Sequence, residues 1–442
     1  MKLINPFHRH DKSQAGASQP PSRLTALSLL SILTGVVVGA ICGIFRLFLE
    51  YLEGLRTALA VGVWHSFPAC LFLIVLGSLS AFIASWMVRR LAPLASGSGI
   101  PHVEAVLAGL TPSASVGLIP VKFIGGLLAI GGGLALGREG PSVQMGATAA
   151  STIGRLLRLG PADCRSLLAA GAGAGLATAF NAPAAGAIFV LEELVGRFEA
   201  RTACSALGAS VSAILVSRAL QGGHPDFVVA DSPLVISVSA QLLFLLTGLA
   251  VGLLSVLYNR TILVTLRLAE RINVGVEIRA AIIGAFGGLI VWLTPHLAGG
   301  GDWITQSAID GTLVWTALPM LYVLRLVFGS VSYAAATPGG LFAPMVALGA
   351  LAGLGCGDLA HVLSSTLAVK TTPFVVVGMA AMFAGAVRAP LTGIILVTEM
   401  TNTPSLLLPL LSGSFAAMFV ADAMGEAPIY QALRVRAAGE KR

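Results

Sequence analysis

The chain has 442 residues, of which 56% are hydrophobic and only 11% are charged. A soluble domain usually carries about 25% charged residues, so this composition excludes an ordinary soluble protein and predicts an all-α polytopic membrane protein. The formal charge of +7 comes from basic residues at the two ends and in short flanks rather than along one stripe. This pattern argues against nucleic-acid binding and predicts that both termini face the cytoplasm.

The predicted elements begin after a polar stretch, residues 1–22, which we interpret as a cytoplasmic extension rather than a cleaved signal. Several of the apolar runs that follow are broken by Gly or Pro, which predicts helices that end inside the membrane against protein or a watery cavity. Residues 426–442 predict a short cytoplasmic helix and tail. The apolar runs are 24–49, 68–88, 117–136, 165–195, 203–219, 234–268, 278–298, 313–335, 341–369, 373–399 and 404–424.

An internal repeat organises these runs. "KFIGG" from Lys122 aligns with "RLVFG" from Arg325, and "NAPAAGAIFVLEE" from Asn181 aligns with "RAPLTGIILVTEM" from Arg388. The repeat predicts two transmembrane halves, 23–220 and 221–425. Broken segments at equivalent places in two halves are typical of transporters whose site lies at the repeat interface. The sequence alone does not distinguish parallel from inverted repeats, and we expect the inverted arrangement.

Three short breaks carry the anion-binding chemistry. In each, glycine opens the segment and proline closes it, which predicts a helix start. Three helix N-termini that meet in the membrane would bind an anion through backbone N–H groups without a buried cation. The residues of the breaks are Gly97, Ser98, Gly99, Ile100 and Pro101; Gly137, Arg138, Glu139, Gly140 and Pro141; and Gly340, Leu341, Phe342, Ala343 and Pro344.

These motifs, together with "NAP" at 181–183, "LEE" at 191–193 and a tyrosine at 430, closely resemble the CLC family of chloride channels and chloride/proton antiporters. The resemblance covers about residues 24–436 and is to the bacterial type, which lacks cytoplasmic regulatory domains. It implies chloride/proton exchange in a bacterial inner membrane, by a homodimer with one pore per subunit. The implied partners are chloride, protons and lipid, and no cofactor is implied. The five cysteines show no CxxC spacing, so neither a disulfide framework nor a metal site is expected.

The resemblance also assigns roles at the anion site. Glu139 is expected to be the external gate, whose carboxylate competes with chloride when charged; the alternative is a helix-capping carboxylate paired with Arg138. Ser98 and Tyr430 are expected to give hydroxyl hydrogen bonds to the anion, and Leu341 and Phe342 to give backbone N–H groups. The alternatives are a small packing residue for Ser98 and an interfacial aromatic for Tyr430.

A second group of residues is expected to handle protons or to support the site. Glu193 matches the family's internal proton-transfer glutamate, and it aligns with Met400 in the repeat, so the repeat symmetry does not account for it. Glu192 aligns with Glu399, which indicates a structural pair. For the remaining two matches we expect a buried ion pair that supports the filter, formed by Glu104 and Lys122.

Other functions fit parts of this pattern. A passive channel of the same fold is the main alternative, although family channels usually lack an acid at the position of Glu193. A fluoride exporter is disfavoured because such members depart from the intact "GSGIP" segment. An intramembrane enzyme using Ser98 and His102 is remote, since Pro101 intervenes and no orienting residue is nearby. One departure from the family is "SYAAATPGG" at 332–340, whose alanines are expected to stiffen the approach to Leu341.

Overall fold

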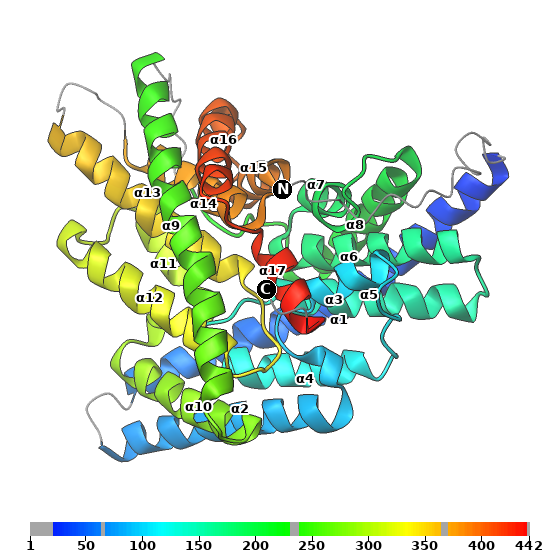
Figure 1. The fold of residues 1–442 in the computed structure, drawn as a ribbon, viewed down its shortest axis with the longest axis horizontal. Coiled ribbons are helices and arrows are strands. Elements are labelled where there is room, and N and C mark those ends of the chain that lie inside the picture. The colour runs from blue at the N-terminus through cyan, green and yellow to red at the C-terminus, as the bar shows by residue number, and fades with distance from the viewer. Residues whose placement is uncertain (1–20, 63–66, 230–237, 364–369, 440–442) are drawn as a thin grey trace, which may run out of the picture.

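The computed structural model describes residues 21–62, 67–229, 238–363 and 370–439. Over these ranges the regular structure is helical, and strand pairing is limited to two isolated bridges (Figure 1). The helices are α1 (Pro21–Gly62), α2 (Phe67–Leu91), α3 (Ile100–Leu107), α4 (Leu118–Gly131), α5 (Glu139–Leu156), α6 (Pro161–Phe180), α7 (Pro183–Phe189), α8 (Ala200–Gln221), α9 (Val238–Arg271), α10 (Val276–Leu293), α11 (Asp302–Ile309), α12 (Leu318–Tyr333), α13 (Phe342–Leu363), α14 (Thr372–Val387), α15 (Pro390–Thr401), α16 (Leu407–Ala423) and α17 (Ile429–Ala437).

The predicted class, an all-α membrane protein with broken helices, is confirmed. Eight helices of the described part are long and apolar enough to cross a membrane. Others are too short to span it, and the predicted run 165–195 divides at Asn181, whose left-handed backbone (φ +50°) ends α6 before α7 begins. At 34 residues, α9 is about 50 Å long. It therefore exceeds the roughly 30 Å of hydrocarbon and must tilt or project beyond it.

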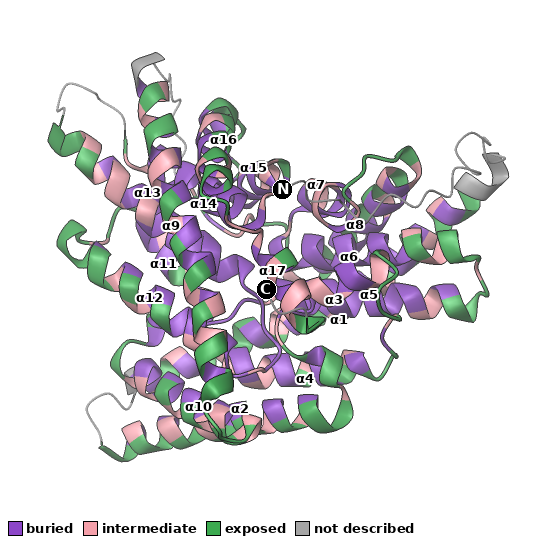
Figure 2. Cartoon of the chain, in the orientation of Figure 1, coloured by how far each residue is buried: buried purple, intermediate pink, exposed green. Residues whose placement is uncertain are grey.

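Burial separates the core helices from those with exposed outer faces (Figure 2). In α6 and α14 the side chains of 167–180 and 373–387 are all buried, so these helices are surrounded by protein on every side. By contrast, α2 and α10 pack against each other and expose large apolar side chains such as Phe72 and Ile282 on their outer surfaces. These exposed faces suit contact with lipid chains.

The second half of the chain repeats the helix order of the first. The eight-residue α3 has its counterpart in the eight-residue α11, and both follow a left-handed glycine, Gly99 or Gly301. Equivalent helices also meet, because α2 packs against α10 and α7 against α15. The boundary that we predicted between 220 and 221 falls at the end of α8, and the predicted tail contains α17. Most of the predicted N-terminal extension lies outside the described residues.

Glycine pairs allow the same close approach in both halves. Gly146 of α5 faces Gly171 of α6, and a Cβ at either residue would collide with the backbone of the other. Gly349 of α13 and Gly378 of α14 make the equivalent contact. Small residues are the usual means of tight helix packing in lipid, where the hydrophobic effect does not drive helices together.

The two aligned cations hold equivalent loops. Lys122 Nζ donates to the carbonyl of Gly97 at 2.7 Å, and Arg325 Nη2 donates to the carbonyl of Gly299 at 2.5 Å. Each cation also bonds to the carbonyl two residues earlier in its loop. Both side chains are almost completely buried, so each compensates the loss of hydration by binding carbonyl oxygens.

Candidate anion and proton site

The three predicted breaks meet in the centre of the molecule through backbone hydrogen bonds. Gly97 N donates to Thr337 O at 3.0 Å, and Gly339 N donates to Gly97 O at 3.1 Å. Gly137 and Gly340 exchange two bonds, of 3.0 and 2.7 Å. The third loop therefore lies between the other two and ties them together, which sequence spacing alone could not establish.

Helices start at these loops as predicted. α3 begins at Ile100 after Gly99, whose φ of +85° belongs to the left-handed region that favours glycine. α5 begins at Glu139, and α13 begins at Phe342. The first-turn N–H groups of a helix have no partner within that helix. Each of these starts therefore offers donors and a partial positive charge to the space where the loops meet.

The Glu139 carboxylate occupies one of these helix starts. Its side chain is fully buried, and Oε1 accepts a hydrogen bond from Phe342 N at 2.6 Å. Its other oxygen, Oε2, has no hydrogen-bond partner among the described residues. The start of α13 thus holds this buried carboxylate through one oxygen, Oε1, and the other oxygen remains without a partner in the described residues.

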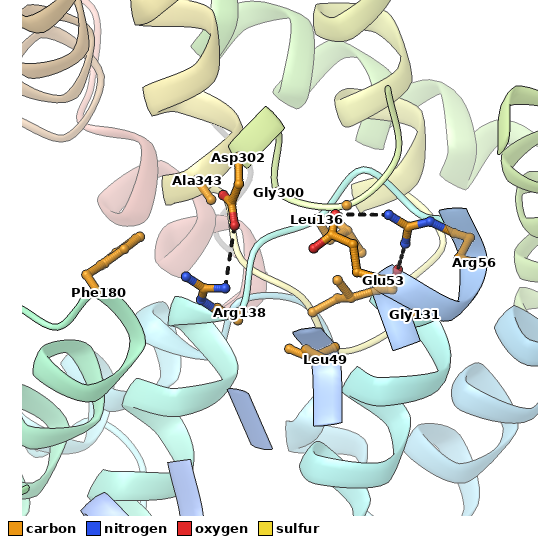
Figure 3. Close-up of a pocket in the computed structure, with 12 residues that line it drawn as sticks. Leu49, Glu53, Arg56, Gly131, Leu136, Arg138, Phe180, Gly300, Asp302 and Ala343 are labelled. Atoms are coloured by element: carbon orange, nitrogen blue, oxygen red, sulfur yellow. Dashed lines mark hydrogen bonds and ion pairs between the residues drawn. The ribbon is translucent and has the colours of Figure 1, made fainter. Parts of the chain in front are cut away.

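The contacts of Arg138 bear on the alternative of a local ion pair with Glu139. Its Nε donates to Ala179 O at 3.0 Å, and its two terminal nitrogens lie 3.4 Å from Asp226 and 3.5 Å from Asp302. Figure 3 shows the contact with Asp302 in a pocket that Glu53 and other side chains also line. The charge of Arg138 is therefore balanced by other acids, and Glu139 is free of a direct ion pair with it.

Two buried hydroxyls lie near the same helix starts. Ser98 Oγ and Tyr430 Oη are both buried, and neither has a hydrogen-bond partner within the described ranges. Ser98 lies against the first turn of α5, since a Cβ added at Gly140 would stand 2.5 Å from Ser98 Oγ. The Tyr430 ring lies 5.6 Å from that of Phe342. Buried polar atoms nearly always have partners, and each of these hydroxyls can still donate one hydrogen bond. Their contact with an anion stays a prediction.

Sequence reasoning missed two further tyrosines. Tyr333 Oη accepts a hydrogen bond from Ser98 N at 3.4 Å, and Tyr258 Oη donates to Leu341 O at 3.3 Å. A signal was available, because the chain has only five tyrosines and Tyr258 interrupts a long apolar run. A phenol inside such a run needs a polar partner.

Glu193 lies in a different region from Glu139. It belongs to the π-helical turn Val190–Leu194 that follows α7, and such turns are frequent at functional sites. Glu193 lines a cavity of 930 Å³ together with Glu104 and Arg434. The carboxyl groups of Glu193 and Glu104 are close enough for their charges to act on each other. Tyr430 lies near enough to Glu139 and Glu193 for both charges to act on its phenol.

The predicted Glu104–Lys122 ion pair is wrong. Glu104 Oε2 pairs with Arg434 of α17 at 3.5 Å, whereas Lys122 binds only loop carbonyls in the described part of the chain. The reason is that α3 presents Glu104 to α17 and Glu193, while Lys122 reaches the loop that precedes α3. Lys122 thus contacts the filter backbone directly, and Glu104 belongs to the cavity of Glu193.

Glu192 and Glu399 cap each other's helices. Glu399 accepts hydrogen bonds from two first-turn N–H groups of α7, the shorter one being 2.8 Å from Ala185 N. Glu192 accepts from the first turn of α15, at 2.6 Å from Thr392 N. Carboxylates at helix starts are stabilised by the unpaired N–H groups and the helix dipole. The geometry supports the structural role that we predicted for both.

Known proteins resemble this chain over almost its whole length. The family model described as "Voltage gated chloride channel" matches residues 80–422. The H(+)/Cl(-) exchange transporter ClcA of Vibrio cholerae is 38% identical, over 98% of this chain and 92% of that protein. The transporter of the same name from Vibrio parahaemolyticus is 36% identical, over 92% of this chain and 88% of that protein. The crystal structure of a slow cyanobacterial Cl−/H+ antiporter has a TM-score of 0.90 and 28% identity, over 96% of this chain and 100% of that one.

Proposed function

Because this chain belongs to the voltage-gated chloride channel (CLC) family, we propose that it exchanges chloride for protons across a membrane. The observation that carries the proposal is the placement of two carboxylates. Glu139 lies at the helix starts that suit an anion, and Glu193 lines a separate cavity. A passive anion pore needs the first arrangement only, whereas an exchanger needs a route for protons as well.

The anion site works by hydrogen bonding without net positive charge. Phe342 N–H and the hydroxyls of Ser98 and Tyr430 are the donors that an anion would meet. The charged Glu139 carboxylate now holds the Phe342 N–H. When Glu139 is protonated, it loses most of its attraction for the helix start, so chloride replaces it there. Each replacement moves one proton on or off Glu139, which couples the two ions.

Protons reach the other side through Glu193. Chloride and a proton have opposite charges, and a wholly shared path would trap one with the other. Glu193 opens into its cavity beside Glu104 and Arg434, whereas the anion donors belong to the filter loops and α17. Tyr430, which both glutamates influence, marks the region where the two routes meet. We assign Glu193 the internal proton transfer.

Family membership and composition support a proposal for the assembly and the orientation of the protein. We propose a homodimer with one pore in each subunit, placed in a bacterial inner membrane with both termini in the cytoplasm. Large apolar side chains such as Leu215 on α8 and Phe415 on α16 are exposed in the single chain. A second copy or lipid would cover such surfaces.

Ion flux in liposomes tests the proposed exchange. The purified protein is reconstituted, a chloride gradient is imposed without a pH gradient, and chloride and pH are recorded together. We expect chloride leaving the vesicle to drive proton uptake against the rising proton gradient. Chloride movement with no accompanying proton movement would instead establish a passive channel.

Replacing Ser98 with proline tests the anion contact. The substitution removes a hydroxyl donor, which costs a compact halide more than nitrate, whose charge is spread over three oxygens. A hydrogen bond to a charged group contributes about 1.5–3 kcal/mol, so we expect selectivity to move toward nitrate by roughly tenfold. Competition between the two anions in the flux assay measures the shift. Unchanged selectivity would mean that the Ser98 hydroxyl does not contact the anion.

A further inference from the structure

Tyr258 contacts the third filter loop through the carbonyl group of Leu341. It lies on α9, far from the three filter loops in sequence, and its side chain is 1% exposed. Its hydroxyl donates to Leu341 O at 3.3 Å, which is its only hydrogen bond to the described residues. The phenol therefore approaches the loop before α13 on the carbonyl side.

The geometry of the peptide group links this contact to Glu139. The carbonyl of Leu341 and the N–H of Phe342 belong to one planar trans peptide group, so they point in opposite directions. The hydroxyl of Tyr258 holds the carbonyl end, and the Glu139 carboxylate accepts from the N–H end at 2.6 Å. Hydrogen bonds in such a chain polarise one another and strengthen each other in a low-dielectric interior.

We propose that Tyr258 is a positioning residue for transport: its hydroxyl orients and polarises the Leu341–Phe342 peptide group so that Phe342 N–H binds Glu139 or the anion that replaces it. The anion part of this inference rests on the proposed function. Simple packing does not account for the hydroxyl, because phenylalanine would fill the same apolar space. Tyr322 provides the contrast, since its buried hydroxyl has no partner in the described residues.

The other groups around Glu139 do not replace Tyr258 in this role. The phenol of Tyr430 on α17 is near enough to Glu139 to sense its charge, but it has no hydrogen bond to the described backbone. Arg138, the residue immediately before α5, is held by Asp226 and Asp302. Tyr258 hydrogen-bonds to the carbonyl of the same peptide group whose N–H donates to Glu139.

The test is the Tyr258→Phe variant, which keeps the ring and removes only the hydroxyl. The bond is long for an O–H···O contact, so we expect the low end of a neutral hydrogen bond's contribution, and chloride affinity should fall by about threefold. Calorimetric titration with chloride measures this fall. The charged form of Glu139 is held less tightly as well, so Glu139 takes up its proton at higher pH. The pH at which flux is half-maximal should therefore rise by about half a unit.

Two comparisons separate this role from packing and from the gate. Tyr322→Phe removes a hydroxyl that holds nothing, so chloride affinity and the pH profile should match wild type. In a Glu139→Ala background, Tyr258→Phe should still weaken chloride binding by the same factor, whereas the pH shift should vanish. If binding weakens but the pH profile never moves, Tyr258 orients the peptide group and the gating role of Glu139 fails instead. Wild-type chloride affinity in Tyr258→Phe, in both backgrounds, would overturn the inference.

Discussion

Replacing Glu139 with alanine is expected to abolish chloride-driven proton uptake while chloride flux continues. The carboxylate is both the group that carries the proton and the group that occupies the start of α13, where Phe342 N now donates to it. Without it, the N–H group is free for an anion and nothing there can take up a proton. Chloride flux should then become independent of pH, as measured with reconstituted protein between acid and neutral buffers.

A matched carboxylate provides the control. Glu50 lies near Arg138, but its side chain is 43% exposed and pairs with Arg46. Glu50→Ala should leave the ratio of protons to chloride unchanged. Chloride-driven proton uptake that persists in Glu139→Ala would show that another group carries the proton, and the role proposed for Glu139 would have to be given up.

The second large effect is expected for Glu193→Gln, which should stop proton transport and leave chloride flux in place. Glutamine keeps the shape of the side chain and removes only the exchangeable proton. Because Glu193 faces the cavity that it shares with Glu104 and Arg434, chloride affinity measured by calorimetry should stay close to wild type. The unchanged chloride affinity distinguishes Glu193→Gln from Glu139→Ala, because Glu139→Ala frees a position that an anion can occupy.

The neighbouring Glu192 provides a control that distinguishes a proton-transfer role of Glu193 from a structural one. Glu192 caps α15, so Glu192→Gln should lower the thermal stability of the protein but preserve coupled proton transport. Full proton transport in Glu193→Gln, or a large loss of chloride binding, would assign Glu193 a structural role. The first result would direct the search for the inner proton exit to Glu192.

Local sequence signals identified the parts of the site that backbone chemistry determines. The helix starts at Ile100, Glu139 and Phe342 were predictable because glycine and proline mark such starts wherever they occur. The equivalence of Lys122 and Arg325 was also predictable, since the two cations align in the repeat, although the carbonyl partners of Lys122 were not predicted. The helix starts depend on residues close together in the chain, and the cation equivalence depends on the internal repeat.

Features that depend on which side of a helix meets a distant segment were not predictable. Glu104 was matched with the wrong cation because its true partner, Arg434, comes from the end of the chain. Tyr258 contacts Leu341 across 83 positions, and nothing in its own helix marks the phenol as part of a filter. A single sequence reveals helix propensity and hydrophobic pattern, whereas these contacts depend on how distant helices pack against each other.

The first apolar run shows a similar limit at a helix end. Hydropathy predicted a segment that ends at 49, whereas α1 continues to Gly62. The continuation carries Glu53 and Arg56, which pair with each other beside the pocket of Arg138 (Figure 3). Glu53 and Arg56 line this pocket together with Arg138 and Asp302, so they end the apolar pattern without ending the helix.

The exchange of caps between α7 and α15 has a consequence for how the protein is assembled during synthesis. Glu399 is 215 residues later in the chain than Ala184, whose N–H it accepts. The ribosome must therefore synthesise the chain as far as Glu399 before the seven-residue α7 can gain its cap. Until then the first half inserts with exposed amide groups at that helix start, which are costly in hydrocarbon. Folding of the first half is therefore completed only when α15 of the second half has been made. A chain truncated before residue 399 would leave α7 without its cap and α15 incomplete.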